Sequence, residues 1–133
     1  MSALSDDNRV NASRPGRLTI GVIGAGRVGA VLASALRSVG HTITAVSRAS
    51  QETLDRVEVL LPGVPMLEIE EVARGCDLLL LTVPDDELPT VTSWLVNQGA
   101  IRPGQIVLHT SGRHGISVLE PAQRVGAIHW HLA

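Results

Sequence analysis

Short runs of apolar residues recur along the chain from Arg17 onward, and glycine, proline or polar stretches separate them. Such runs between turn residues are typical of buried β-strands. The pattern predicts six strands, at residues 17–23, 41–46, 64–67, 77–83, 105–109 and 127–132. The run "DLLLLTV" at 77–83 is apolar at successive positions, which is typical of a strand in the middle of a parallel sheet.

Between these runs, apolar residues return every three or four positions, which is the spacing of one helix face. The clearest case extends from Val28 to Val39, and Gly40 follows where a helix commonly ends. Pro89 fits a helix only in its first turn, because proline has no N–H to donate farther along. Besides the helix that ends before Gly40, helices are predicted at residues 50–61, 68–74, 86–97 and 116–124.

The alternation of strands and helices predicts an α/β fold, with a doubly wound, mainly parallel sheet covered by helices on both faces. Right-handed crossovers leave few topologies, and we expect the strand order 3-2-1-4-5-6. Residues 1–16 are polar and show no sustained period, so we expect a flexible tail there. Residues 17–133 are expected to form one domain, with no second domain in this chain.

The composition fits such a sheet and narrows the functional classes. Hydrophobic residues make up 44% and aromatic residues 2%, so the core is built from small and branched aliphatic side chains. A net charge of −2 gives no electrostatic basis for binding nucleic acid or an anionic membrane. The single Cys76 cannot form an internal disulfide and fits a reducing compartment. No apolar run approaches the ~20 residues of a membrane span, and we expect a cytoplasmic protein.

A glycine-rich turn follows the first predicted strand and opens the first helix. It reads Gly24-Ala25-Gly26-Arg27-Val28-Gly29, a G-x-G-x-x-G pattern. In a dinucleotide site the first glycine permits the tight turn, the second lets the backbone approach a pyrophosphate, and the third allows close helix packing. The helix N-terminus offers N–H groups and partial positive charge to the phosphates. The alternative is a glycine-rich turn without a ligand.

The end of the second strand bears on the choice of dinucleotide. An NAD site places an acidic residue there, about 20 residues after the glycine motif, to bind the ribose 2′-hydroxyl. Here the sequence has Ser47 and Arg48 and no acid. A hydroxyl and a guanidinium suit a 2′-phosphate, which favours NADP(H) over NAD(H). The alternative is that Arg48 is a solvated loop residue and Ser50 a helix N-cap.

The end of the fourth strand also reaches the edge where open α/β sheets bind ligands. Val83 and Pro84 follow Thr82 there, and we expect them to pack against the cofactor's ribose. Asp85 is expected to cap the next helix.

The fifth strand ends in "HTSG", residues 109–112. His109 and Ser111 are candidate catalytic residues, because a histidine acts as general acid or base near neutral pH. Thr110 is expected beside the cofactor. The alternative is a polar turn of structural importance only.

His129 and His131 alternate on the last predicted strand and share a face, as two metal ligands do. No third ligand stands at suitable spacing, and Trp130 between them indicates ordinary packing. We therefore expect no metal site.

The motifs "GVIGAGRVG", "SRAS", "LLLLTVPDDEL" and "VLHTSG", in this order, resemble the N-terminal Rossmann-like domain of NADP oxidoreductase-like proteins. That group includes pyrroline-5-carboxylate reductase and the wider 6-phosphogluconate dehydrogenase-like superfamily. The sequence is most similar to uncharacterised proteins that pair this domain with a C-terminal helical domain, and "HTSG" is the motif more specific to them. The resemblance covers Arg17 to Leu132.

The resemblance implies that His109 to Gly112 face the nicotinamide. It also implies that substrate binding and homodimer formation use the C-terminal helical domain. The NADP(H)-binding residues that it implies are Gly24, Ala25, Gly26, Arg27, Val28, Ser47, Arg48, Val83 and Pro84.

Two functions follow as alternatives. The first is an oxidoreductase that transfers a hydride between NADP(H) and a small carbonyl or imine substrate, with this chain supplying the cofactor half. The second is a non-catalytic module that binds or senses NADP(H). The family pattern includes a His-Pro pair near the point where this sequence reads "HWHLA", and that pair is absent here. We therefore interpret the chain as truncated, as a fragment lacking its substrate domain, or as a naturally shortened gene.

Overall fold

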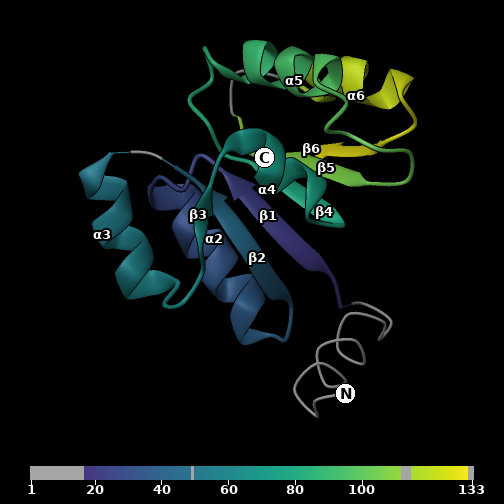
Figure 1. The fold of residues 1–133 in the computed structure, drawn as a ribbon. Helices are drawn as coiled ribbons and strands as arrows, with labels where there is room; N and C mark the ends of the chain where they lie inside the picture. The colour runs from purple at the N-terminus through teal and green to yellow at the C-terminus, as the bar shows by residue number, and fades with distance from the viewer. Residues whose placement is uncertain (1–16, 49, 112–114, 132–133) are drawn as a thin grey trace.

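A computed structural model describes residues 17–48, 50–111 and 115–131. Its six strands form one sheet in the order β3-β2-β1-β4-β5-β6, and every neighbouring pair is parallel (Figure 1). The α/β class, the doubly wound parallel sheet and the expected strand order are thereby confirmed. The tail expected at residues 1–16 lies outside the described residues.

The predicted elements are present, most of them with shorter bounds than the sequence indicated. The strands are β1 Thr19–Ile23, β2 Thr42–Ser47, β3 Met66–Leu67, β4 Leu78–Leu81, β5 Ile106–His109 and β6 Ile128–His131. The helices are α2 Arg27–Ser38, α3 Gln51–Leu60, α4 Ile69–Arg74, α5 Leu88–Asn97 and α6 Glu120–Arg124, with a 3-10 turn η1 at Ile116–Leu119.

Successive residues of β4 point to opposite sides of the sheet. Leu78 and Leu80 pack on the side of α2 and α3, whereas Leu79 and Leu81 pack on the side of α4, α5 and α6. All four side chains are buried, which explains why this run is apolar throughout. Figure 1 shows the same division, with α2 and α3 on one side of the sheet and α4, α5 and α6 on the other.

Helix α2 packs through its smallest residues. Gly29, Ala30 and Ala33 are buried, while Val28 and Val31 are 61% and 54% exposed. The apolar spacing that begins at Val28 indicated one buried helix face, and the structure does not bury these two valines. Small side chains allow the helix axis to approach the sheet closely, and the valines then lie to the side of the contact. Gly40 has a φ of 103°, consistent with its predicted place after the helix end.

Helix α5 begins at Leu88 and has Pro89 in its first turn, as the sequence required. Its N-cap position is held by Glu87, so Asp85 does not occupy the cap that was expected for it. The backbone N–H of Leu88 instead bonds to the carbonyl of Asp85, 3.4 Å away. The polypeptide therefore makes one tight turn between β4 and α5.

Strand β6 lies at the edge of the sheet and pairs with β5. Trp130 lies opposite Leu108 and is 51% exposed. About half of its surface is therefore buried, whereas the sequence indicated ordinary packing. None of the helices in the described part of the chain is long and apolar enough to cross a membrane.

Candidate functional site

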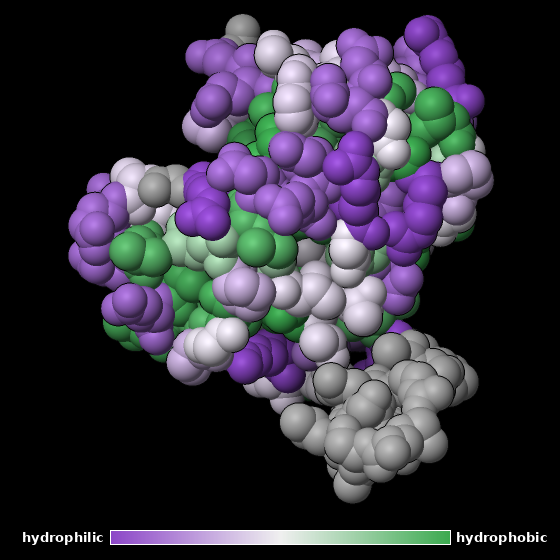
Figure 2. Space-filling model, viewed as in Figure 1, coloured by the Kyte–Doolittle hydropathy of each residue, from purple (hydrophilic) through white to green (hydrophobic). Residues whose placement is uncertain are grey.

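A cleft of about 640 Å³ lies at the carboxyl ends of β1, β2 and β4. The strand order reverses at β1, and ligands of open α/β sheets bind at this switch point. Figure 2 shows an indentation between the part of the molecule formed by α3 and the part formed by α5 and α6. The cleft is lined by Ile23, Gly24, Ala25, Gly26, Arg27, Val28, Ser47, Arg48, Thr53, Ile69, Thr82, Val83, Pro84, Glu87 and Val91.

The glycine loop forms a tight turn from β1 into α2. Gly24 has a φ of 87°, and its carbonyl accepts a hydrogen bond of 2.8 Å from the N–H of Gly26. The first bond of the helix runs from the N–H of Ala30 to the carbonyl of Gly26, at 2.9 Å. The N–H groups of residues 27–29 precede that bond and are left for a ligand. The helix has no acidic residue in its first turn, so its positive end is not neutralised there.

Gly26 and Gly29 lack a side chain for different reasons. A Cβ added at Gly26 would meet no protein atom within 4 Å, and the backbone there has a φ of −67° that any residue adopts. The missing side chain therefore leaves open space in the cleft, as the approach of a phosphate requires. A Cβ at Gly29 would overlap Oγ1 of Thr82, which makes this glycine a packing requirement.

The two residues at the end of β2 lie in different environments. Ser47 is 3% exposed, and its Oγ accepts a hydrogen bond of 2.9 Å from the N–H of Gly24. Arg48 is exposed, and its Nε lies 3.0 Å from Oε1 of Glu68. Ser50 is the N-cap of α3 and accepts a 3.4 Å hydrogen bond from the N–H of Thr53, as one of the alternatives held.

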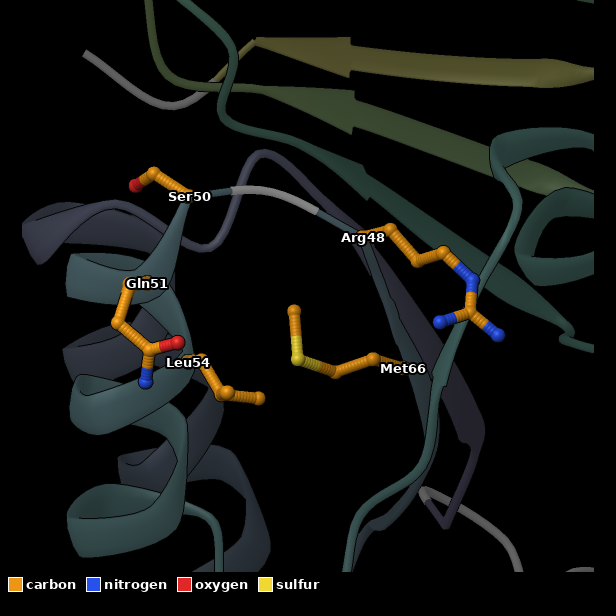
Figure 3. Close-up of a pocket in the computed structure, with 5 residues that line it drawn as sticks. All are labelled: Arg48, Ser50, Gln51, Leu54 and Met66. Atoms are coloured by element: carbon orange, nitrogen blue, oxygen red, sulfur yellow. The ribbon is translucent and has the colours of Figure 1, made fainter.

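A smaller cavity of about 240 Å³ lies beside Arg48, between α3 and β3. Figure 3 shows the side chains of Leu54 and Met66 extending toward each other across it, whereas the guanidinium of Arg48 points away. Ser50 and Gln51 complete its lining. Arg48 therefore lines both hollows, with its charged end turned toward Glu68.

The candidate acid–base residues of β5 lie outside the cleft lining. His109 is completely buried, and its Nδ1 accepts a 3.1 Å hydrogen bond from the N–H of Ser111. Nε2 must then carry the ring proton of the neutral form, and it donates to the carbonyl of Gly115 at 2.9 Å. The geometry favours a structural role, in which the ring joins the end of β5 to Ser111 and Gly115. Catalytic roles for His109 and Ser111 stay predictions, and Gly112 lies outside the described residues.

Thr110 and Gly29 are likewise absent from the cleft lining, although both were expected in the cofactor site. Among the residues that the structure describes, no group of three His, Cys, Asp or Glu side chains is placed to hold a metal ion. The side chain of His131 is not among those described, so the expectation for that pair of histidines stays a prediction.

Sequence reasoning missed six residues of the cleft lining. Thr82 directly follows a buried strand, and that position was a usable signal. The others come from helices or from a strand end without distinctive spacing. They are Ile23, Thr53, Ile69, Glu87 and Val91.

The sequence from residue 4 to residue 133 matches the model of a family described as the Rossmann-like domain. The chain belongs to this family. Its parallel sheet and its glycine loop at the switch point are the features that such a domain uses to hold dinucleotides.

Solved structures of longer proteins share the fold. The 3-hydroxyisobutyrate dehydrogenase of Mycobacterium tuberculosis is 18% identical with a TM-score of 0.71, and the match covers 85% of this chain and 39% of that one. An imine reductase of Streptomyces aurantiacus is 20% identical with a TM-score of 0.62, and the match covers 84% of this chain and 39% of that one. A Bacteroides fragilis protein named as a candidate NADP oxidoreductase is 23% identical with a TM-score of 0.65, and the match covers 78% of this chain and 39% of that one. The chain thus spans about two fifths of each relative. No curated protein matches the sequence.

Proposed function

We propose that this Rossmann-like domain binds NADP(H) and is the cofactor-binding part of an oxidoreductase acting on a small carbonyl or imine substrate. The observation that carries the proposal is the open position of Gly26. The N-terminus of α2 faces a cleft of about 640 Å³, and the missing Cβ leaves the helix N–H groups open to a phosphate. The solved structures named above are those of a dehydrogenase, an imine reductase and a candidate NADP oxidoreductase.

Each part of the cleft suits one part of a dinucleotide. The N–H groups of Arg27 and Val28 line the cleft and suit a pyrophosphate, and Val83 and Pro84 offer an apolar surface to a ribose. Arg48 directly follows the end of β2, where the adenine ribose lies in such folds. NADP(H), when bound, supplies or accepts the hydride. The protein supplies position and electrostatics.

The preference for NADP(H) over NAD(H) rests on the two residues at the end of β2, Ser47 and Arg48. Ser47 stands where an NAD site places an acidic residue, and it has no carboxylate to offer to a ribose hydroxyl. Its own hydroxyl is buried and bonded to the glycine loop. Arg48 is exposed and offers a guanidinium, which binds phosphate in a bidentate manner. Its present partner is the carboxylate of Glu68, an exposed ion pair of the kind that contributes only about 0–1 kcal/mol. A 2′-phosphate can therefore compete for it.

The Gly26→Ala variant tests the phosphate site. The change meets no protein atom within 4 Å, so we expect an unchanged melting temperature. The new methyl group would stand where the pyrophosphate approaches, so we expect NADPH affinity, measured by isothermal titration calorimetry, to fall by about tenfold or more. Gly115→Ala is the matched control, since it also meets open space but lies outside the cleft lining.

Three results would contradict the proposal. Equal NADPH affinity in Gly26→Ala and the unchanged protein would remove the phosphate from the glycine loop. Tighter binding of NADH than of NADPH would reverse the cofactor preference. Failure of the unchanged protein to bind either nucleotide would remove the dinucleotide site itself.

A non-catalytic module that binds or senses NADP(H) is the second candidate. The observation that favours it is the position of His109, which is fully buried with both ring nitrogens hydrogen-bonded. Turnover of a panel of carbonyl and imine substrates with NADPH separates the two functions. Hydride transfer by this chain would favour the oxidoreductase. Tight NADPH binding without hydride transfer would favour either the module or a cofactor-binding part that acts only together with a substrate domain.

A further inference from the structure

Two hydroxyl groups hold the first glycine of the loop from opposite sides. The N–H of Gly24 donates to Oγ of Ser47 at 2.9 Å, and the carbonyl of Gly24 accepts from Oγ1 of Thr82 at 2.6 Å. Ser47 ends β2 and Thr82 directly follows β4, the two strands that flank β1. Both peptide groups of Gly24 are thereby tied to neighbouring strands, and we name this arrangement the hydroxyl clamp.

We propose that Ser47 and Thr82 are positioning residues, which set cofactor affinity by fixing the glycine loop before the cofactor arrives. This inference rests on the proposed NADP(H) site. Gly24 has a φ of 87°. Because a glycine has no side chain, many other backbone conformations are also accessible to this residue. Rotation of either of its peptide groups would redirect the N–H groups that begin α2. A clamp on both groups removes that freedom and reduces the ordering cost of binding.

The surroundings of Thr82 show that its side chain is built into the loop. The carbonyl of Gly24 also accepts the N–H of Gly26 at 2.8 Å, so the hydroxyl and the turn meet on one oxygen. A Cβ at Gly29 would overlap Oγ1 of Thr82. The third glycine of the motif therefore makes room for this hydroxyl, in addition to its general role in helix packing.

The position of Ser47 indicates a structural role in the loop, whereas the sequence suggested a direct contact with the 2′-phosphate. Its side chain is 3% exposed and its oxygen already accepts the N–H of Gly24. The serine therefore joins the end of β2 to the glycine loop. The contact with a 2′-phosphate is then left to Arg48, which is exposed beside it.

The test compares variants that remove one hydroxyl each. Thr82→Val keeps the shape of the side chain and removes the hydrogen bond to Gly24, and Ser47→Ala removes the other bond. Thr82→Ser retains the hydroxyl. Thr92→Val is the matched control, because the buried hydroxyl of Thr92 also bonds to a backbone carbonyl, that of Leu88 at 2.8 Å in α5. NADPH affinity is measured by calorimetry and stability by thermal unfolding.

We expect Thr82→Val and Ser47→Ala to weaken NADPH binding about tenfold each, with losses of stability no larger than that of Thr92→Val. Thr82→Ser is expected to bind within about threefold of the unchanged protein. Unchanged affinity in Thr82→Val and Ser47→Ala would overturn the inference. An equal loss of affinity in Thr92→Val would also overturn it, because the effect would then be one of general stability.

A second measurement keeps the clamp testable without a cofactor. Amide hydrogen exchange of Gly24 and Gly26, whose N–H groups are hydrogen-bonded in the loop, should be faster in the ligand-free Thr82→Val and Ser47→Ala proteins than in Thr92→Val. Equal exchange in all three would overturn the clamp. If the unchanged protein binds no dinucleotide while the exchange rates differ as expected, the proposed function fails and the clamp on the loop stands.

Discussion

At the end of β2, a single arginine is shared between a carboxylate of the protein and the site proposed for a phosphate. Nε of Arg48 lies 3.0 Å from Oε1 of Glu68, and both side chains are more than half exposed. Exposed ion pairs of this kind are weak, whereas a dianionic phosphate pairs strongly with a guanidinium. In the proposed complex, Glu68 would therefore compete for the arginine and repel the 2′-phosphate.

Glu68→Gln should raise NADPH affinity about three- to tenfold, because it frees Arg48 and removes a negative charge. NADH affinity should change less, since NADH has no 2′-phosphate. Calorimetry with both cofactors gives the ratio. Glu120→Gln is the control, as Glu120 forms an equally short exposed pair with Arg124 in α6. The same gain for NADH, or a gain that persists when Arg48 is also replaced by Gln, would argue against this role of Glu68.

The sequence could predict which residues line the cleft where they lie at or just after the carboxyl end of a strand. Gly26, Arg48 and Val83 line the cleft because the carboxyl ends of neighbouring parallel strands meet at one edge. The pairing of Arg48 with Glu68 was not predictable, since it depends on how the chain after β3 lies beside β2. The burial of His109 was missed because alternation along β5 does not say which side the helices cover.

At the scale of elements, Gly21 brings β1 and α4 into close contact. A Cβ at this position would stand 2.9 Å from both Cγ1 and the carbonyl oxygen of Val72, and 3.0 Å from Sγ of Cys76. The oxygen belongs to the backbone of α4, so the helix itself would have to move. The glycine in the middle of a buried strand is therefore explained by the helix that covers it.

Gly21→Ala should lower the free energy of unfolding by about 1–3 kcal/mol, the usual cost of adding a methyl group to a close-packed core. Chemical denaturation measures the change. Gly115→Ala should be close to neutral in the same experiment, because its Cβ meets open space. A stability loss in Gly21→Ala no greater than in Gly115→Ala would mean that α4 moves away from the sheet at little cost.

The existence and order of the elements followed from the sequence, because each strand and helix has its own period. The face that α2 buries did not follow. Its valines are more hydrophobic than its alanines, yet the close approach to the sheet selects Gly29, Ala30 and Ala33. Hydropathy measures the tendency of a side chain to leave water, while helix packing also depends on its size. The strand predicted at 64–67 was too long, because its apolar stretch begins before the two residues that pair as β3.

At the scale of the whole molecule, the composition provides very few side chains that titrate at alkaline pH. All 11 basic residues are arginine, and the sequence contains no lysine and no tyrosine. Between about pH 9 and pH 11, Cys76 is therefore the one side chain of the sequence whose ordinary pKa falls near the range. Its thiol is buried between α4 and the start of β4, and burial raises its pKa from 9.0 to about 11.

The free energy of unfolding should fall as the pH rises from about 9 to about 11. In this range the unfolded chain loses the thiol proton while the folded chain keeps it, so the unfolded state binds fewer protons and is favoured. A shift from 9.0 to about 11 corresponds to a loss of about 2–3 kcal/mol across the range. Denaturant titrations at intervals of pH measure this slope. Cys76→Ala should be flat over the same range whatever its stability at pH 8, and parallel slopes in the two proteins would show that another group is responsible.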